Sequence, residues 1–300
     1  ALDLACAAGF HEAITYSFQA EAVGRRLPGA GRAQAAVPLR NALGPQWAWL
    51  RVSCLPGLLE SCARNQARAQ ERTRLVEVGH AFWGPAGPQP PTEPLLIALV
   101  DHVPGGDAAE AGDRLRQLLA TLAVIGERVG ATPLEFQPAD GAEPGWHPSR
   151  VVHLRSGGVW LGLAGEVDDA VAASFDLRGR VVAAELRGDG WLQDGGRVPR
   201  VHPVARTPAV VADISVVVGE RAALGAALGA VREADVPQLE SIRLLDEYTD
   251  ARLGLAHKGW TFRLVLRDPT RTLTGAEAHV VRDRIVTILS VAVDARLREG

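Results

Sequence analysis

The chain has 300 residues, 47% of them hydrophobic, and a formal net charge of -3 at pH 7. This length fits one large domain or two ordinary domains with real hydrophobic cores. The small net charge argues against a nonspecific binder of polyanions, although one face could still be basic. The three cysteines, Cys6, Cys54 and Cys62, form no CxxC pair, so the sequence predicts neither a metal site nor a disulfide framework.

No apolar run approaches the length of a membrane span, and residues 1–10 lack the basic segment of a signal peptide. We therefore expect a cytoplasmic protein with no membrane association. The chain contains no methionine, and Leu2, Leu4 and Cys6 already follow a helical apolar pattern. Residue 1 is therefore expected to lie inside a longer natural polypeptide.

The N-terminal region alternates predicted helices and strands. Residues 1–9 predict a helix that ends at a glycine, and residues 10–18 predict a strand. Residues 41–45 have the composition of a turn, and a short strand follows them. Ser53 is then a candidate N-cap for an amphipathic helix, and residues 75–78 alternate as a second strand.

The rest of the first domain predicts an antiparallel sheet with helices. Its strands are expected at residues 95–100, 159–166 and 181–186, and a long amphipathic helix is expected at residues 107–129. His147 lies beside Pro148 without a nearby nucleophile or metal-ligand partner, so we expect it to pack in a turn.

A linker rich in glycine and proline occupies residues 188–200, after which the pattern restarts. The expected elements are strands at 210–218, 239–248, 260–266 and 295–297, with helices at 222–234 and 274–293. This βαββαβ order is that of the ferredoxin-like split βαβ fold. The predicted fold class is therefore α+β, with domains at residues 1–197 and 198–300.

Several motifs carry a resemblance to a known family. They include FHEAITYSF from Phe10, LRVSCLPGLL from Leu50, VEVG from Val76, ADISVVV from Ala212, LLDEYTD from Leu244 and RTLTGAE from Arg271. In this order they closely resemble the β subunit of bacterial phenylalanyl-tRNA synthetase. The resemblance covers essentially the whole chain. It implies a class II synthetase-like domain over residues 1–197 and a ferredoxin-fold anticodon-binding domain over residues 198–300.

The resemblance also implies that the first domain has lost its catalytic activity. In catalytic relatives, an arginine that grips the α-phosphate of ATP closes a Gly-Arg-x-(Tyr/Phe)-Arg sequence. The comparable segment here runs from Gly79 to Trp83, and an indole offers one donor and no charge. We therefore expect no catalytic residue and no cofactor in this chain, with ATP and Mg²⁺ bound elsewhere in the complete enzyme. The implied partners are the catalytic α subunit, in an (αβ)2 assembly, and tRNA(Phe).

In the second domain, the resemblance places the anticodon-binding site around the LLDEYTD segment. Tyr248 would stack on the first anticodon base, and Asp246 would accept hydrogen bonds from a guanine edge. Ser215, Lys258 and Arg263 complete the implied site.

Two features of this domain limit its expected contacts with RNA. Lys258-Gly259-Trp260 stands where the family usually has Lys-Ser, so a serine hydroxyl contact is expected to be missing, and Ala212 replaces the usual arginine. The basic and acidic side chains of the domain balance, so phosphate contacts are expected to be few and local. The candidates for these contacts are Lys258, Arg263, Arg267 and Arg271.

Two other functions stay open from the sequence. The ferredoxin-like domain could belong to an amino-acid-sensing regulatory protein without tRNA binding, because the fold alone does not exclude this. The chain could also be an active single-chain synthetase, but the missing arginine argues against that hypothesis.

Overall fold

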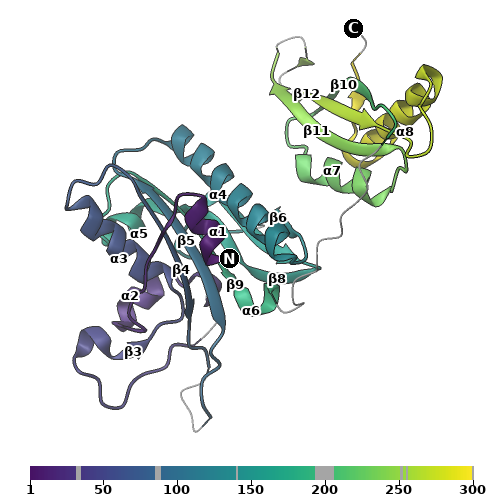
Figure 1. The fold of residues 1–300 in the computed structure, drawn as a ribbon. Helices are drawn as coiled ribbons and strands as arrows, with labels where there is room; N and C mark the ends of the chain where they lie inside the picture. The colour runs from purple at the N-terminus through teal and green to yellow at the C-terminus, as the bar shows by residue number, and fades with distance from the viewer. Residues whose placement is uncertain are drawn as a thin grey trace. The chain divides into compact units, whose positions relative to one another are not determined.

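A seven-stranded sheet forms the centre of the first of two units, Ala1–Pro199 and Arg200–Gly300 (Figure 1). The predicted boundary between residues 197 and 198 lies outside the residues that are described. The computed structural model describes residues 1–31, 35–84, 89–139, 141–192, 206–250, 253–254 and 256–298.

The large sheet has the strand order β1-β4-β5-β9-β8-β7-β6, and every pair in it is antiparallel except β1–β4. The strands of this unit are β1 (His11–Glu12), β2 (Phe18–Gln19), β3 (Trp49–Leu50), β4 (Thr73–His80), β5 (Leu95–Val103), β6 (Leu134–Pro138), β7 (Trp146–Ser156), β8 (Val159–Val167) and β9 (Arg180–Arg187). β2 and β3 pair separately from the large sheet. The expected antiparallel-dominated α+β architecture is confirmed.

Helices cover both faces of the large sheet. They are α1 (Leu2–Ala7), α2 (Glu21–Arg26), α3 (Leu55–Gln66), α4 (Ala108–Val129), α5 (Asp169–Ser174) and α6 (Gly188–Trp191), with single 3-10 turns η1 (Gly29–Gly31) and η2 (Pro45–Trp47). The longest of them, α4, begins at Asp107, whose carboxylate accepts the N–H of Glu110, and ends at Gly130 with φ 70°. Within the described ranges, no helix is both long and apolar enough to cross a membrane.

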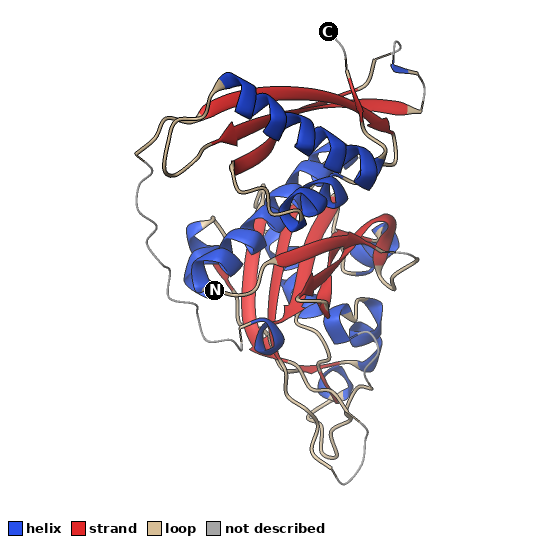
Figure 2. Ribbon diagram, turned by 90° about the vertical axis from the view of Figure 1, so that its right-hand side faces the viewer, coloured by secondary structure: helices blue, strands red, loops and turns tan. Residues whose placement is uncertain are grey.

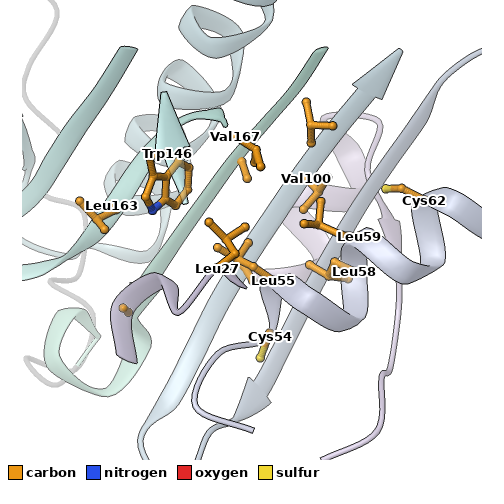
Figure 3. Packing of buried hydrophobic residues seen from close by; sticks show 14 of the residues in the cluster. Leu27, Cys54, Leu55, Leu58, Leu59, Cys62, Val100, Trp146, Leu163 and Val167 are labelled. Atoms are coloured by element: carbon orange, nitrogen blue, oxygen red, sulfur yellow. The ribbon is translucent and has the colours of Figure 1, made fainter. Parts of the chain in front are cut away.

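Two hydrophobic clusters lie on opposite faces of the sheet because side chains alternate along each strand. On β9, Val181 and Ala183 join the cluster under α3, whereas Val182 and Ala184 join the cluster under α4. The predicted apolar stripe of α3 is fully buried, and Figure 3 shows it facing the sheet. The residues of this stripe are Leu55, Leu58, Leu59 and Cys62.

Two local predictions are wrong in this unit. The expected strand over residues 10–18 is broken, because Thr15 donates its N–H and its hydroxyl to the carboxylate of Glu77 instead of to a neighbouring strand. Ser53 is not the N-cap of α3; Cys54 holds that position. The Ser53 hydroxyl accepts the N–H of Leu55 but donates to the carboxylate of Glu185.

The second unit has a four-stranded antiparallel sheet in the order β11-β12-β10-β13. In chain order this is 2-3-1-4, the arrangement of a ferredoxin-like fold, and both helices pack on one face of the sheet (Figure 2). The prediction of a ferredoxin-like fold is confirmed. The elements are β10 (Val210–Gly219), α7 (Leu224–Glu233), β11 (Leu239–Tyr248), β12 (His257–Leu266), α8 (Gly275–Val293) and β13 (Arg296–Leu297).

Candidate nucleic-acid interface

The face of the second sheet that carries no helix brings together four of the five residues expected to bind the anticodon, Ser215, Asp246, Tyr248 and Arg263. On β12, Trp260 and Phe262 point into the core, so Thr261 between them points to the open face. Both Ser215 on β10 and Asp246 on β11 pair with Thr261 in the sheet register. The Ser215 and Thr261 hydroxyls lie 3.1 Å apart, so a carboxylate and two hydroxyls form a row across the open face.

A β-bulge decides which face Asp246 occupies. Leu244 pairs with Phe262 and packs on the core, and a regular strand would place Asp246 on that same side. The register shifts between Leu244 and Asp246, with Leu245 as the extra residue. The shift turns Asp246, and with it Tyr248, to the open face.

The ring of Tyr248 lies flat on the sheet over Gly259, its register partner. A Cβ placed on Gly259 would lie 2.3 Å from the ring carbon that bears the hydroxyl. The substitution that removes the expected serine contact therefore makes room for the aromatic ring.

Arg298 contacts the same ring, and the sequence analysis did not identify it. Its backbone N–H donates to the Ser215 carbonyl at 2.9 Å, which places it beside the row of polar side chains. Its guanidinium donates to the Tyr248 hydroxyl at 2.6 Å and lies 5.5 Å from the ring centroid. Arg298 belongs to none of the recognised motifs, so this contact could not be inferred from the sequence.

Lys258 is not brought together with the other candidate residues. It shares the strand face of Trp260, and its ammonium lies 5.0 Å from that ring. The ammonium pairs with the carboxylate of Glu247 at 3.1 Å. The Trp260 indole and then Lys258 donate to this carboxylate, which lowers the pKa of Glu247.

The three arginines proposed for phosphate contacts are also paired within the unit. Arg263 lies on the open face and binds Asp213 through two hydrogen bonds of 2.8 and 2.7 Å, which lower the pKa of the aspartate. Arg267 pairs with Glu240. Arg271 pairs with Glu277 at 2.6 Å, and with the cap at Thr274 this lowers the pKa of Glu277 to about 2. A phosphate would have to compete with a carboxylate at each of these arginines.

The position at which the sequence resemblance predicts the loss of a phosphate-binding arginine holds a buried tryptophan. Trp83 is 7% exposed, and its indole N–H donates to the Val52 carbonyl at 2.8 Å. The guanidinium of Arg187 lies 5.8 Å from the Trp83 ring. Trp83 and Val52 both belong to the apolar cluster under α3. The residues at this position do not fit a nucleotide phosphate, because the single donor of Trp83 is already used.

Buried Glu185 binds the segments around Ala30 and Cys54 on the face of the sheet that α3 covers. Its carboxylate accepts the N–H of Ala30 at 2.8 Å, the N–H of Cys54 at 2.7 Å and the hydroxyl of Ser53 at 3.0 Å. Burial raises the pKa of Glu185 to about 7, although these hydrogen bonds oppose the rise. Ala30 lies in η1, which is buried throughout, so this loop packs closely against the sheet.

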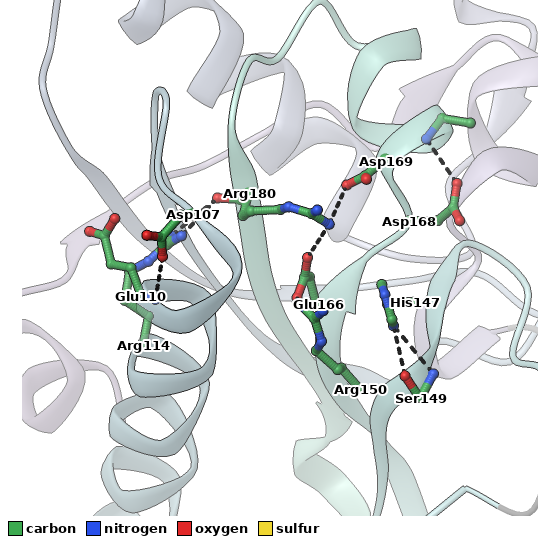
Figure 4. Close-up of polar contacts among 11 residues, drawn as sticks. Asp107, Glu110, Arg114, His147, Ser149, Arg150, Glu166, Asp168, Asp169 and Arg180 are labelled. Carbon is green, nitrogen blue, oxygen red and sulfur yellow. Dashed lines mark hydrogen bonds and ion pairs between the residues drawn. The ribbon is translucent and has the colours of Figure 1, made fainter.

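Other charged and polar residues of the first unit form contacts that support its structure. Glu166 is 1% exposed and accepts hydrogen bonds from Arg150 and Arg180, and Arg180 also pairs with Asp169 at 2.9 Å (Figure 4). His147 makes two weak contacts through Nδ1, 3.3 Å from the backbone nitrogen and 3.4 Å from the hydroxyl of Ser149 (Figure 4). Within the described ranges, no group of three or more His, Cys, Asp or Glu side chains is placed to hold a metal ion.

One stretch of the first unit exposes large apolar side chains. Ile14, Tyr16 and Phe18 are 88%, 80% and 45% exposed, and they alternate along the segment that joins β1 to β2. A row of exposed apolar side chains of this kind is typical of a protein–protein contact.

Comparisons with known proteins cover both units. Residues 2–187 match the model of the phenylalanyl tRNA synthetase beta chain CLM domain, and residues 205–298 match that of the ferredoxin-fold anticodon binding domain. The phenylalanine–tRNA ligase beta subunit of Moorella thermoacetica is 35% identical over 302 residues, which cover 99% of this chain and 37% of that protein. The beta subunit of Anaeromyxobacter dehalogenans is 35% identical over 307 residues, which cover 97% of this chain and 37% of that protein.

The chain thus spans 37% of the length of these two relatives. Among solved structures, a pyrrolysyl tRNA synthetase of Desulfitobacterium hafniense has a TM-score of 0.49 at 14% identity, over 66% of this chain and 68% of that one.

Proposed function

This chain belongs to the phenylalanyl-tRNA synthetase β-chain family, and on that premise we propose that it is a noncatalytic part of the ligase that binds the anticodon of tRNA(Phe) and docks to the catalytic α subunit. The second unit supplies the anticodon contact and the first unit supplies the docking surface. ATP and Mg²⁺ are bound elsewhere in the (αβ)2 assembly, which works in the cytoplasm.

The observation that supports RNA binding is the open face that carries Asp246, Tyr248 and the hydroxyls of Ser215 and Thr261. An unpaired base stacks on an aromatic ring whatever its identity, so the ring contributes affinity. Selection needs a hydrogen-bonding group at the base edge. The Asp246 carboxylate accepts the two donors of a guanine edge and repels the acceptor edges of other bases.

Equilibrium binding of tRNA(Phe) by the full chain tests this function. Asp246→Asn keeps the shape of the side chain but adds donors, so we expect affinity to fall by about tenfold, or 1.4 kcal/mol. Asp283→Asn is the matched control, since Asp283 is an exposed aspartate on α8 that lies away from the open face. Equal affinities for the two variants would contradict anticodon reading by Asp246.

The observation that supports docking is the exposed row of Ile14, Tyr16 and Phe18. Co-expression with the α subunit tests it, with light scattering to measure the (αβ)2 mass. Ile14→Asp and Tyr16→Asp are expected to prevent co-purification, because each places a charge in an apolar contact. Val291→Asp is the control, since Val291 is 86% exposed on α8 of the other unit. Undiminished complex formation by the Ile14 and Tyr16 variants would exclude this surface.

Loss of catalysis is supported by Trp83, whose buried indole stands where catalytic relatives carry an arginine. The purified chain is expected to show no phenylalanine-dependent exchange of pyrophosphate into ATP. Measurable exchange by the chain alone would overturn this part of the proposal.

Amino-acid sensing is a second candidate because the second unit has a cavity of about 510 Å³ between the ends of α7 and α8. Arg221 and Arg296 line it and could bind a carboxylate, and Asp294 could bind an ammonium group. Calorimetry with free phenylalanine discriminates between the two functions. Binding that Arg221→Ala abolishes would favour the sensor.

A further inference from the structure

We propose that Tyr248, Gly259 and Arg298 form a preassembled stacking platform for an unpaired RNA base, with Arg298 as the residue that positions the ring. This inference rests on the proposed anticodon-binding function and adds two residues to it. It explains why position 259 is a glycine and position 298 an arginine.

Gly259 is required by contact rather than by backbone conformation. Its φ is not among the positive values that favour glycine, so the backbone alone would accept any residue here. A Cβ would instead meet the Tyr248 ring at 2.3 Å, and its hydroxyl oxygen at 2.6 Å. These atoms belong to a rigid ring, so any side chain at this position would lift the ring off the sheet.

Arg298 binds the hydroxyl end of the ring, which also lies over Gly259. A guanidinium N–H of Arg298 donates to the Tyr248 hydroxyl at 2.6 Å. The backbone N–H of Arg298 donates to the Ser215 carbonyl, which fixes the position of the arginine. The ring is therefore held by its own strand, by the surface of Gly259 and by the guanidinium. Tyr248 as a whole stays partly exposed.

A ring fixed in this way binds a base more tightly than a mobile one. A free tyrosine side chain loses rotamer freedom when a base stacks on it, whereas a fixed ring has already lost that freedom. Asp246 lies two residues from Tyr248 on the same strand and face, so a base stacked on the ring presents an edge to the carboxylate. The platform thus contributes affinity, and Asp246 contributes selectivity.

Binding of the full chain to an RNA hairpin that carries the anticodon loop of tRNA(Phe) tests the platform. Arg298→Ala and Gly259→Ala are each expected to weaken binding by about tenfold, because each releases the ring. Arg232→Ala is the matched control. Arg232 is an exposed arginine in the last turn of α7, which packs on the opposite face of the sheet, so we expect a change of less than about twofold.

A double-mutant cycle separates positioning from simple attraction to phosphate. If Arg298 acts through the ring, Arg298→Ala will cause no additional loss in the Tyr248→Ala background. Full additivity of the two losses, or equal losses for Arg298→Ala and Arg232→Ala, would overturn the positioning role.

Nuclear magnetic resonance provides a readout that does not depend on RNA. The chain contains two tyrosines, so selective labelling resolves the Tyr248 ring. A ring stacked on Gly259 shifts the α-protons of that glycine upfield, and Arg298→Ala is expected to reduce the shift while leaving the thermal unfolding unchanged. An unshifted Gly259 in the wild-type chain would contradict the platform.

The variants also separate this inference from the proposed function. If the wild-type chain binds the hairpin, and Asp246→Asn weakens binding but Arg298→Ala does not, only the platform fails. If the wild-type chain does not bind the hairpin, anticodon binding fails and the platform fails with it.

Discussion

The guanidinium of Arg51 donates to the carboxylate of Glu77 at 2.7 Å, and the two side chains are only 5% and 3% exposed. Both residues lie in motifs that carry the family resemblance, LRVS and VEVG, and Thr15 of a third motif binds the same carboxylate. Three segments that are separate in sequence therefore meet at one buried ion pair. The motifs that identify the family serve here to assemble the sheet rather than to bind a substrate.

Glu77→Ala is expected to destabilise the first unit by about 3–5 kcal/mol, because it leaves the Arg51 charge buried without a partner. Urea unfolding measures the change. Arg25→Ala is the control, since it breaks an exposed pair with Glu21 and is expected to cost less than about 0.5 kcal/mol. Similar losses for the two variants would show that the Arg51–Glu77 pair is not an important link.

The stability of the first unit is expected to depend on pH through Glu185. Its pKa is about 7 in the folded chain and 4.5 when unperturbed. Because the folded state holds the proton more tightly, stability is highest below pH 4.5 and falls as the pH rises through 7. The difference amounts to about 3 kcal/mol, from 1.36 kcal/mol per pKa unit.

Urea unfolding at pH 5.5 and pH 8 checks the role of Glu185. Glu185→Gln cannot ionise, so it should remove this part of the pH dependence, and the difference between variant and wild type isolates it from other titrating groups. Parallel pH profiles for the two proteins would contradict the raised pKa.

Restoring the missing arginine is not expected to restore activity. Trp83→Arg places a charge in an apolar cluster near Arg187 and should cost more than about 3 kcal/mol in the free energy of unfolding. Trp83→Phe removes the hydrogen bond to the Val52 carbonyl and part of the buried ring system, and should cost about 1–3 kcal/mol. Pyrophosphate exchange by a folded Trp83→Arg chain would show that the site is not closed.

The affinity for tRNA(Phe) is expected to depend only weakly on salt concentration, because the basic side chains that are candidates for phosphate contacts are already paired with carboxylates. Asp213→Ala releases Arg263 on the open face. The variant should bind tRNA(Phe) more tightly at low salt, and the slope of log K against log salt should steepen by about 0.7, the value for one phosphate on a single strand. An unchanged slope would mean that Arg263 does not reach the RNA.

The sequence predicted the arrangement of elements better than it predicted the site. Periodicity located the long helix at residues 107–129 and the strand at residues 239–248, since apolar spacing follows directly from burial. It did not predict β6 (Leu134–Pro138), a largely exposed edge strand without a clear apolar face. It also could not show that a glutamate side chain would interrupt the strand at Thr15.

Within the site, sequence proximity was a poor guide to spatial proximity. Lys258 lies next to Gly259 in the chain but faces the opposite side of the sheet, because neighbours in a strand alternate. Asp246 reaches the open face only through the bulge at Leu245, which no motif indicates. Tyr248 on β11 and Arg298 just after β13 belong to opposite edges of the sheet, 50 residues apart in the chain, and they meet only through their side chains.

The most direct test of the account is a titration of the isotope-labelled chain with the anticodon hairpin of tRNA(Phe), followed by amide chemical shifts. We expect the largest changes at Ser215, Tyr248, Gly259 and Thr261 on the open face. Changes confined to the cavity beside Ala223, Leu253 and Ala292, or no changes at all, would contradict anticodon reading by this surface.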